Sequence, residues 1–125
     1  MNGMVLLVLA GFQIKHLIAD YFLQFNWMVS EKGDLTKLGG YAHAGMHVLG
    51  SLIVLVIAQV PVIAVIGLLI GEFVIHYTLD YAKVFYSRDV SSESNPRRYW
   101  ALHGFDQFLH HMTYIGMTFV VMLVK

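Results

Sequence analysis

Four long apolar segments alternate with short polar ones along the chain of 125 residues. They cover residues 4–27, 41–60, 61–86 and 99–124, and each is close to the about 20 residues that a helix needs to cross a bilayer. Pro61 suits the first turn of its helix, because the N–H group that proline lacks would be unpaired there. The pattern predicts an all-α polytopic membrane protein, with four transmembrane helices in an antiparallel bundle that forms one domain over residues 1–125.

The composition agrees with a membrane protein and limits the chemistry that the chain can perform. Hydrophobic residues make up 58% of the chain and charged residues 13%, against about 25% charged in soluble domains, and the mean hydropathy is +0.64. Eight basic and eight acidic residues give a net charge of zero, so we predict no nucleic-acid partner. There is no cysteine, which means that any metal ion must be held by nitrogen and oxygen ligands.

The basic residues predict how the chain is oriented, because short loops rich in Lys and Arg stay in the cytoplasm. The polar segments after the first and third spans, together with the end of the third span, contain Lys32, Lys37, Lys83, Arg88, Arg97 and Arg98. The turn around Gln59 contains no basic residue, and Lys125 is alone at the carboxyl terminus. We therefore predict a multi-pass protein of the cell (inner) membrane with both termini outside the cytoplasm.

Ionisable and amide side chains recur inside the predicted spans at helical spacing. Residues three or four apart share a helix face, so each span presents a stripe of groups able to ligate metal. The stripes are His16, Asp20 and Gln24; His43 and His47; Glu72, His76, Asp80 and Lys83; and His103, Asp106, Gln107, His110 and His111.

Because alternate spans run in opposite directions, all four stripes are predicted in the cytoplasmic half of the membrane. An outer layer contains Asp20, His43, Asp80 and His103 or Asp106, and a layer one turn deeper contains His16, His47, His76 and His110. Facing helices of a bundle hold metal ions with inward carboxylate and imidazole ligands. Two such layers are therefore expected to hold two ions.

From these layers we predict the role of each side chain. The metal ligands are His16, Asp20, His43, His47, His76, Asp80, Asp106 and His110, and the catalytic residues are Asp20, Asp80 and Asp106. On the fourth span Gln107 and His111 form a neighbouring stripe that could face inward instead; we favour Asp106 and His110 because a carboxylate is the stronger ligand. Contacts to the ligands or the substrate are predicted for Gln24, Glu72, Lys83, His103, Gln107 and His111.

Two interpretations without a metal remain open. Polar side chains in spans also join helices by hydrogen bonds worth roughly 0.6–2 kcal/mol each. Three aspartates fit that role poorly, since an ionised carboxylate costs on the order of 3 kcal/mol at mid-span. Lys15 is expected to snorkel to the interface, which leaves His⁺ or a divalent cation as the partner of these carboxylates. A metal-free proton or ion relay is the second alternative.

Three strings of residues resemble recurring motifs of a known family. HLIADYFLQ (residues 16–24), HYTLDYAK (76–83) and DQFLH (106–110) are similar to the motifs of an uncharacterised family of small bacterial and phage four-helix integral membrane proteins. The resemblance covers nearly the whole chain and implies a membrane location and these HxxxD, HxxxDxxK and DQxxH residues as the site, but no reaction. The ligand types are also loosely similar to those of membrane-bound metal-dependent hydrolases.

A mixed His and Asp ligand set suits Zn, Mn or Fe, and two such ions can clamp a phosphoester and lower the pKa of a bound water to about 7. We therefore predict a divalent-metal-dependent hydrolase that acts on a membrane-associated, amphiphilic or phosphate-containing substrate. The alternatives are a metal-ion or proton transporter that uses the same cluster, and a His-rich membrane di-iron oxygenase. A homodimer would suit a transporter, because four spans enclose little volume.

Overall fold

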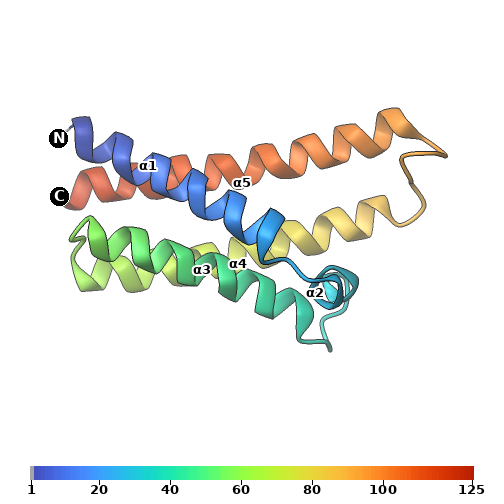
Figure 1. Ribbon diagram of the computed structural model, residues 1–125, viewed down its shortest axis with the longest axis horizontal. Coiled ribbons are helices and arrows are strands. Elements are labelled where there is room, and N and C mark those ends of the chain that lie inside the picture. Colours follow the sequence, from blue (N-terminus) through green and yellow to red (C-terminus); the bar gives the residue numbers. More distant parts are fainter. Residues whose placement is uncertain (1) are drawn as a thin grey trace.

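The computed structural model describes residues 2–125 and consists of helices joined by short connections (Figure 1). Four helical segments are long and apolar enough to cross a membrane. They are α1 (Asn2–Leu17) with its π-helical continuation η1 (Ile18–Phe22), α3 (Gly39–Ile57), α4 (Val62–Ser87) and α5 (Pro96–Val124). The prediction of an all-α, four-helix membrane bundle is confirmed.

The four long helices form a ring in which each packs against two neighbours: α1 against α3 and α5, and α4 against α3 and α5. Both termini lie at one end of the bundle, and α2 and the α4–α5 connection lie at the other (Figure 1). We call these the terminal end and the loop end. In the terminal half the interior is an apolar core that includes Val8, Phe12, Leu55, Met117 and Val121.

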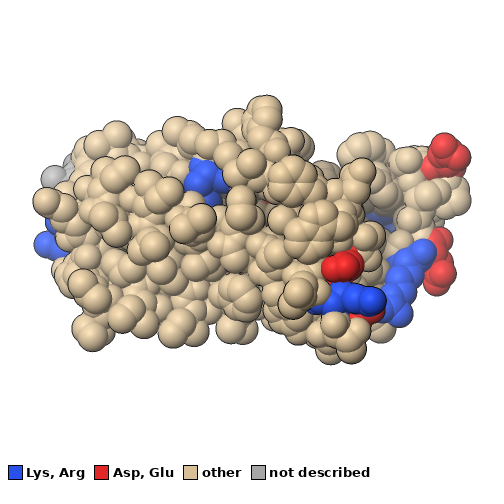
Figure 2. Space-filling model, turned by 60° about the horizontal axis from the view of Figure 1, so that its bottom comes forward, with Lys and Arg blue, Asp and Glu red and all other residues tan. Residues whose placement is uncertain are grey.

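Large apolar side chains cover the outside of the bundle, as expected of helices that face lipid. Leu7, Ile63 and Leu123 are 74%, 83% and 67% exposed. Lys, Arg, Asp and Glu side chains gather at the loop end, and few lie over the middle of the face shown in Figure 2. The surface therefore has the distribution of charge that a membrane protein needs.

Two predicted boundaries differ from the structure. The first span was predicted to reach residue 27, but its helix ends at Phe22 in the π-helical turn η1. The fourth span begins at Pro96, before the predicted residue 99, because the side chain of Asn95 accepts a hydrogen bond from the Arg98 N–H (3.2 Å) and caps the helix. Pro61 directly precedes α4.

A short helix that the hydrophobic pattern did not predict, α2 (Asn26–Glu31), lies against the start of α3. The approach is close enough to require glycine at Gly39, where a Cβ atom would lie 2.6 Å from Glu31 Cβ and 2.8 Å from the Trp27 carbonyl oxygen. Glu31 Oε1 also accepts a hydrogen bond from the Gly39 N–H at 3.0 Å. These contacts hold α2 beside the polar interior of the loop half.

Candidate metal centre

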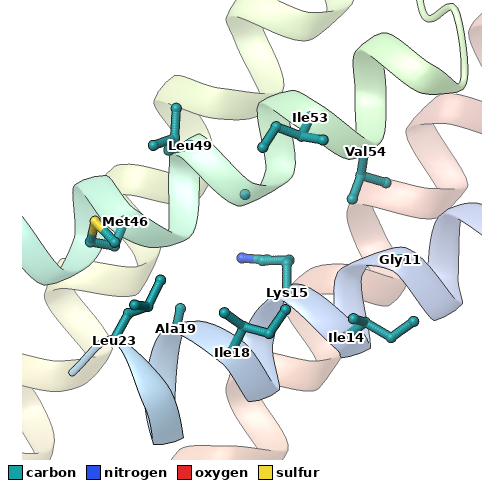
Figure 3. A pocket seen from close by; sticks show the side chains of 11 residues that line it. Gly11, Ile14, Lys15, Ile18, Ala19, Leu23, Met46, Leu49, Ile53 and Val54 are labelled. Carbon is teal, nitrogen blue, oxygen red and sulfur yellow. The ribbon is translucent and has the colours of Figure 1, made fainter.

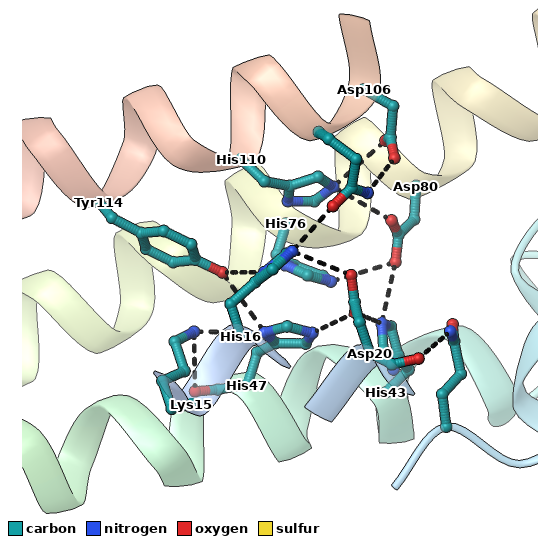
Figure 4. Close-up of polar contacts among 12 residues, drawn as sticks. Lys15, His16, Asp20, His43, His47, His76, Asp80, Asp106, His110 and Tyr114 are labelled. Atoms are coloured by element: carbon teal, nitrogen blue, oxygen red, sulfur yellow. Dashed lines mark hydrogen bonds and ion pairs between the residues drawn. The ribbon is translucent and has the colours of Figure 1, made fainter. Parts of the chain in front are cut away.

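Eight side chains from the four long helical segments converge inside the loop half of the bundle (Figure 4). Each segment contributes one pair spaced by four residues: His16 and Asp20, His43 and His47, His76 and Asp80, and Asp106 and His110. All are buried except Asp20, whose side chain is 13% exposed. The four stripes predicted from the sequence thus face one another, and Asp106 and His110 are the inward pair of the fourth span.

Asp20 lies in η1, where the wider π-helical turn carries its carboxylate between histidines of two helices. Its Oδ1 atom is 2.8 Å from His47 Nε2 and 3.1 Å from His43 Nε2, and its Oδ2 atom is 3.1 Å from His16 Nε2. Within residues 2–125 no Lys or Arg forms an ion pair with Asp20. Single π-helical turns are often found at functional sites.

Asp80 occupies the matching position on the other side of the bundle. Its Oδ2 atom is 3.2 Å from His76 Nε2 and 3.7 Å from His43 Nε2, and its Oδ1 atom is 3.3 Å from His110 Nε2. His110 Nε2 is also 3.2 Å from Asp106 Oδ1. The carboxylates and imidazoles therefore form one continuous network across all four helices.

Two groups within this network could hold a metal ion, because their ligand atoms lie within 4.8 Å of one another. The first consists of Asp20, His43, His47 and His76, and the second of His76, Asp80 and His110. His76 belongs to both. Each group combines residues of the outer and the deeper predicted layer, so the two groups lie side by side instead of one above the other.

Three ligand atoms of these groups are buried and have no hydrogen-bond partner among the described residues: His43 Nε2, His76 Nε2 and Asp80 Oδ2. The two nitrogens lie 3.7 and 3.2 Å from the oxygen, but without the geometry of a hydrogen bond. Ligands of a tetrahedral Zn ion, each about 2.1 Å from it, lie about 3.4 Å apart. The spacing of His76 Nε2 and Asp80 Oδ2, which both belong to the second group, fits two atoms that share an ion, and His43 Nε2 belongs to the first group with Asp20.

His16 has a different environment from the other histidines, since hydrogen bonds occupy both of its ring nitrogens. Nε2 donates to Gln107 Oε1 at 2.9 Å, and Nδ1 lies 2.7 Å from the Tyr114 hydroxyl. Gln107 in turn donates to Asp106 Oδ2 at 2.9 Å. His16 lies outside both ligand groups, and its contacts orient the Asp20 carboxylate.

Lys15 is buried, not snorkelling as the sequence suggested: its side chain is 7% exposed. It pairs with Glu72 of α4, its Nζ donates to the His47 carbonyl oxygen at 3.2 Å, and the same Nζ lies 3.2 Å from His47 Nδ1. Glu72 supplies an opposite charge at the same depth as Lys15. Because this carboxylate is nearer to the ammonium group than the membrane interface is, the lysine stays inside the bundle.

The stem of Lys15 crosses an apolar groove of about 350 Å³ between α1 and α3 (Figure 3). Gly50 makes room for it, because a Cβ atom there would lie 3.0 Å from Lys15 Cβ. This groove opens on the outside of the bundle beside Leu49 and Ile53, both more than half exposed.

The remaining predicted residues surround the cluster. Gln24 Nε2 donates to the Asp20 carbonyl oxygen at 2.9 Å, and Lys83 Nζ lies 2.9 Å from His103 Nδ1 and 3.5 Å from Asp106 Oδ2. The ring of His111 lies 4.9 Å from that of His16, between centroids, and makes no hydrogen bond within the described chain.

Three residues without a predicted site role touch the cluster: Lys15, Lys32 and Tyr114. Lys32 Nζ lies 3.6 Å from Asp80 Oδ2. Tyr114 follows His110 by four residues, so helical spacing places both on one face, and this signal was present in the sequence. Lys32 had no comparable signal, because its position depends on α2.

A cavity of about 90 Å³ connects the cluster with the loop end. It is lined by Asp20, Tyr21, Gln24, Lys32, Asp80, Lys83, His103, Asp106 and Gln107. On its terminal side the cluster is instead closed by Tyr114 and the apolar core, in which Phe12 and Leu55 are fully buried. Polar access is therefore found at one end of the bundle.

The comparisons with known proteins identify a family but no activity. A family model described as "Protein of unknown function (DUF3307)" matches residues 8–125. No curated protein and no solved structure matches the chain. The matched region contains every residue of both ligand groups.

Proposed function

The chain belongs to the DUF3307 family, and from the chemistry of its site we propose that it is a divalent-metal-dependent hydrolase of membrane-associated phosphoesters. The observation that carries the proposal is the set of buried ligand atoms His43 Nε2, His76 Nε2 and Asp80 Oδ2, which face one another without hydrogen-bond partners. Leaving such atoms unpaired in a low-dielectric interior is costly, and a bound cation removes that cost.

The donor set fits Zn, Mn or Fe, which accept imidazole and carboxylate ligands together. The charges support a cation as well. Asp20 is surrounded by histidines, and Lys32 and Lys83 approach Asp80 and Asp106 no closer than 3.6 and 3.5 Å. One divalent ion would offset two of the three carboxylate charges at the centre of the network, and two ions would offset all three.

Access from one end supports an enzyme over a transporter. On the terminal side of the cluster lie the buried Lys15–Glu72 pair and, beyond it, apolar residues such as Val8, Phe12 and Val121, which leave no polar route to that end within the described chain. A hydrolase needs access for water and substrate from a single side. The cavity at the loop end supplies it.

Each residue then has a chemical task. Asp20, His43, His47 and His76 would hold one ion, and His76, Asp80 and His110 a second. When bound, such ions lower the pKa of a water to about 7 and polarise a phosphoryl oxygen.

Asp106 lines the cavity and lies outside both ligand groups, and its oxygens accept hydrogen bonds from His110 at 3.2 Å and Gln107 at 2.9 Å; because it holds no ion, it is the carboxylate that would take a proton. In the hydrolysis of a phosphomonoester the water oxygen bonds to phosphorus and the P–O bond to the alcohol breaks. One water proton would pass to Asp106 and from there to the departing alcohol oxygen, while the other stays on the phosphate, so that the products are an alcohol and hydrogen phosphate and Asp106 is ionised again. No oxidant or reductant is consumed.

The test compares a ligand variant with a proton-transfer variant. Purified protein in detergent, loaded with Zn or Mn, is assayed for phosphate release from dodecyl phosphate, with metal content measured on the same samples. We expect turnover that chelation abolishes. Asp80→Ala should lose metal and turnover together, whereas Asp106→Asn should retain metal and lose about 100-fold or more in turnover, the size typical of general acid–base catalysis.

Asp89→Asn is the matched control, because Asp89 is exposed in the α4–α5 connection and should change neither quantity. Metal-dependent ion flux into liposomes, combined with no turnover on a panel of lipid and nucleotide phosphates, would refute the hydrolase proposal and favour transport. Wild-type protein that holds no metal would refute the metal centre itself.

A further inference from the structure

We infer that Lys32 and Lys83 form the phosphate-binding subsite of this centre, and that its substrate is a phosphomonoester carried on a single apolar chain. The inference rests on the proposed function and extends it to the class of substrate. The two lysines line the cavity at the loop end, one from the segment after α2 and the other from α4.

The lysines reach the cluster from two sides. Lys32 Nζ lies 3.6 Å from Asp80 Oδ2, and Lys83 Nζ lies 3.5 Å from Asp106 Oδ2. Neither contact is a hydrogen bond, so both ammonium groups retain donors for a ligand in the cavity. His103 Nδ1, 2.9 Å from Lys83 Nζ, holds that lysine at the wall.

The charge of the cavity favours an anion once the carboxylates are compensated. Three aspartates line it with two lysines, so the unloaded site repels anions. Divalent cations held by Asp20 and Asp80 reverse that balance and leave the lysines available for a doubly charged group. Two cationic side chains match the dianion of a phosphomonoester better than the monoanion of a diester.

The size of the cavity limits what can enter it. A volume of about 90 Å³ is well below the roughly 300–1,000 Å³ of pockets that enclose a whole drug-sized ligand, and it suits a small group such as phosphate. The remainder of the substrate must therefore stay outside the cavity.

The surroundings of the cavity mouth indicate that this remainder is apolar. Tyr21 lines the cavity and is 65% exposed, Phe22 beside it is 70% exposed, and Trp100, 60% exposed, packs against His103 with ring centroids 5.9 Å apart. Exposed aromatic side chains of this kind mark the level of the membrane–water interface. A phosphate in the cavity is thus at headgroup depth, and a chain attached to it extends into lipid.

Lys32 is held in place by the segment that joins α2 to α3. A Cβ atom on Gly40 would lie 3.3 Å from Lys32 Cα, so this backbone lies directly on α3. Asp34 Oδ1 accepts hydrogen bonds from the Thr36 N–H at 2.9 Å and hydroxyl at 2.6 Å, which fixes the turn and lowers the pKa of Asp34. The lysine is therefore part of a structured wall.

The experiment measures binding of dodecylphosphonate, whose C–P bond hydrolysis cannot break, to Zn-loaded protein by isothermal titration calorimetry. Lys32→Gln and Lys83→Gln should each weaken binding by about tenfold or more, the effect of losing a charge-assisted hydrogen bond. Lys37→Gln and Arg88→Gln are the matched controls, because both cations are exposed and outside the cavity: Lys37 lies in the same connection as Lys32, and Arg88 caps the end of the helix that carries Lys83. Metal content should be unchanged in all four variants.

Two further ligands identify what is recognised. Inorganic phosphate should bind at least about tenfold more weakly than dodecylphosphonate if the apolar chain contributes, since each buried CH₂ is worth about 0.8 kcal/mol. The monomethyl ester of dodecylphosphonate, with one charge, should also bind more weakly.

The outcomes separate this inference from the proposed function. Metal-loaded protein that binds dodecylphosphonate equally well in wild type, Lys32→Gln and Lys83→Gln overturns the subsite and leaves the metal centre standing. Equal binding of inorganic phosphate overturns the apolar chain. Loss of metal in the lysine variants would show a structural role for the lysines and overturn the subsite as well, whereas wild-type protein without metal overturns both proposals.

Discussion

His76 is the ligand whose loss should have the largest effect, because it is the member common to both ligand groups. His43 belongs to the first group alone and His110 to the second alone. We expect His43→Ala and His110→Ala each to weaken one of the two positions, so that one ion per chain remains once gel filtration has removed free and weakly held metal. His76→Ala should weaken both positions and leave less than one ion per chain.

The size of the effect follows from mass action. Changing a residue that merely orients a ligand costs 10–100-fold in metal affinity, so removing a ligand should cost about 100-fold or more. An ion present at about 1,000 times its Kd stabilises the folded state by about 4.1 kcal/mol, and at about 10 times its Kd by about 1.4 kcal/mol. Weakening one position therefore lowers the free energy of unfolding by about 2.7 kcal/mol. His76→Ala weakens both positions and loses this amount twice.

The assay combines elemental analysis after gel filtration with thermal unfolding in detergent, with and without added Zn. His111→Ala is the matched control: His111 is a histidine on the same helix as His110, and it lies outside both groups. It should keep two ions and the metal-dependent rise in Tm.

Equal losses of metal in His43→Ala, His76→Ala and His110→Ala would refute the shared ligand. So would retention of full metal by His76→Ala. In the first case the ions would have to be held by one larger group, and in the second by carboxylates without this imidazole.

Three other outcomes are expected. For orientation, Lys37→Cys and Gln59→Cys are treated on intact cells with a membrane-impermeant thiol reagent, and we expect label at position 59 and protection at position 37; the reverse would place the cluster at the outer face. For the buried ion pair, Lys15→Met should reduce the free energy of unfolding by about 3–5 kcal/mol, because it leaves Glu72 unpaired. Adding Glu72→Met should recover much of that loss. If the two changes instead lower the free energy of unfolding additively in denaturation experiments, the pair is not coupled. For ring orientation, Tyr114→Phe removes the hydroxyl that lies 2.7 Å from His16 Nδ1 and 3.5 Å from His47 Nδ1. Metal affinity, measured by competition with a chelator, should then fall about 10–100-fold. Unchanged affinity would show that Tyr114 does not orient these rings.

Much of the site could be predicted because helical spacing and depth in the membrane are both encoded locally. A His and an Asp four residues apart must share a helix face, and the alternating direction of the spans brings faces of equal depth together. For this reason the pairs on different helices were correctly expected to converge, as the contacts of Asp20 with His47 at 2.8 Å and of Asp80 with His110 at 3.3 Å illustrate.

What escaped prediction depends on contacts between segments far apart in the sequence. The burial of Lys15 requires Glu72, which is 57 residues away, and the space left by Gly50. The position of Lys32 requires α2 to pack on Gly39, and the apolar pattern of residues 4–27 conceals the end of the first helix at Phe22. Hydropathy alone records none of these pairings.

The distribution of ligands over the helices also sets an order in which the centre can mature during synthesis. The first ligand group draws on η1, α3 and α4, so it is complete as soon as α4 has joined its predecessors. The second group must wait for His110 on α5, the last helix to be made. An ion bound at this stage would already hold the ring of His76 in position. The intermediate of three helices would then contain one complete ligand group, against which α5 packs when it is made.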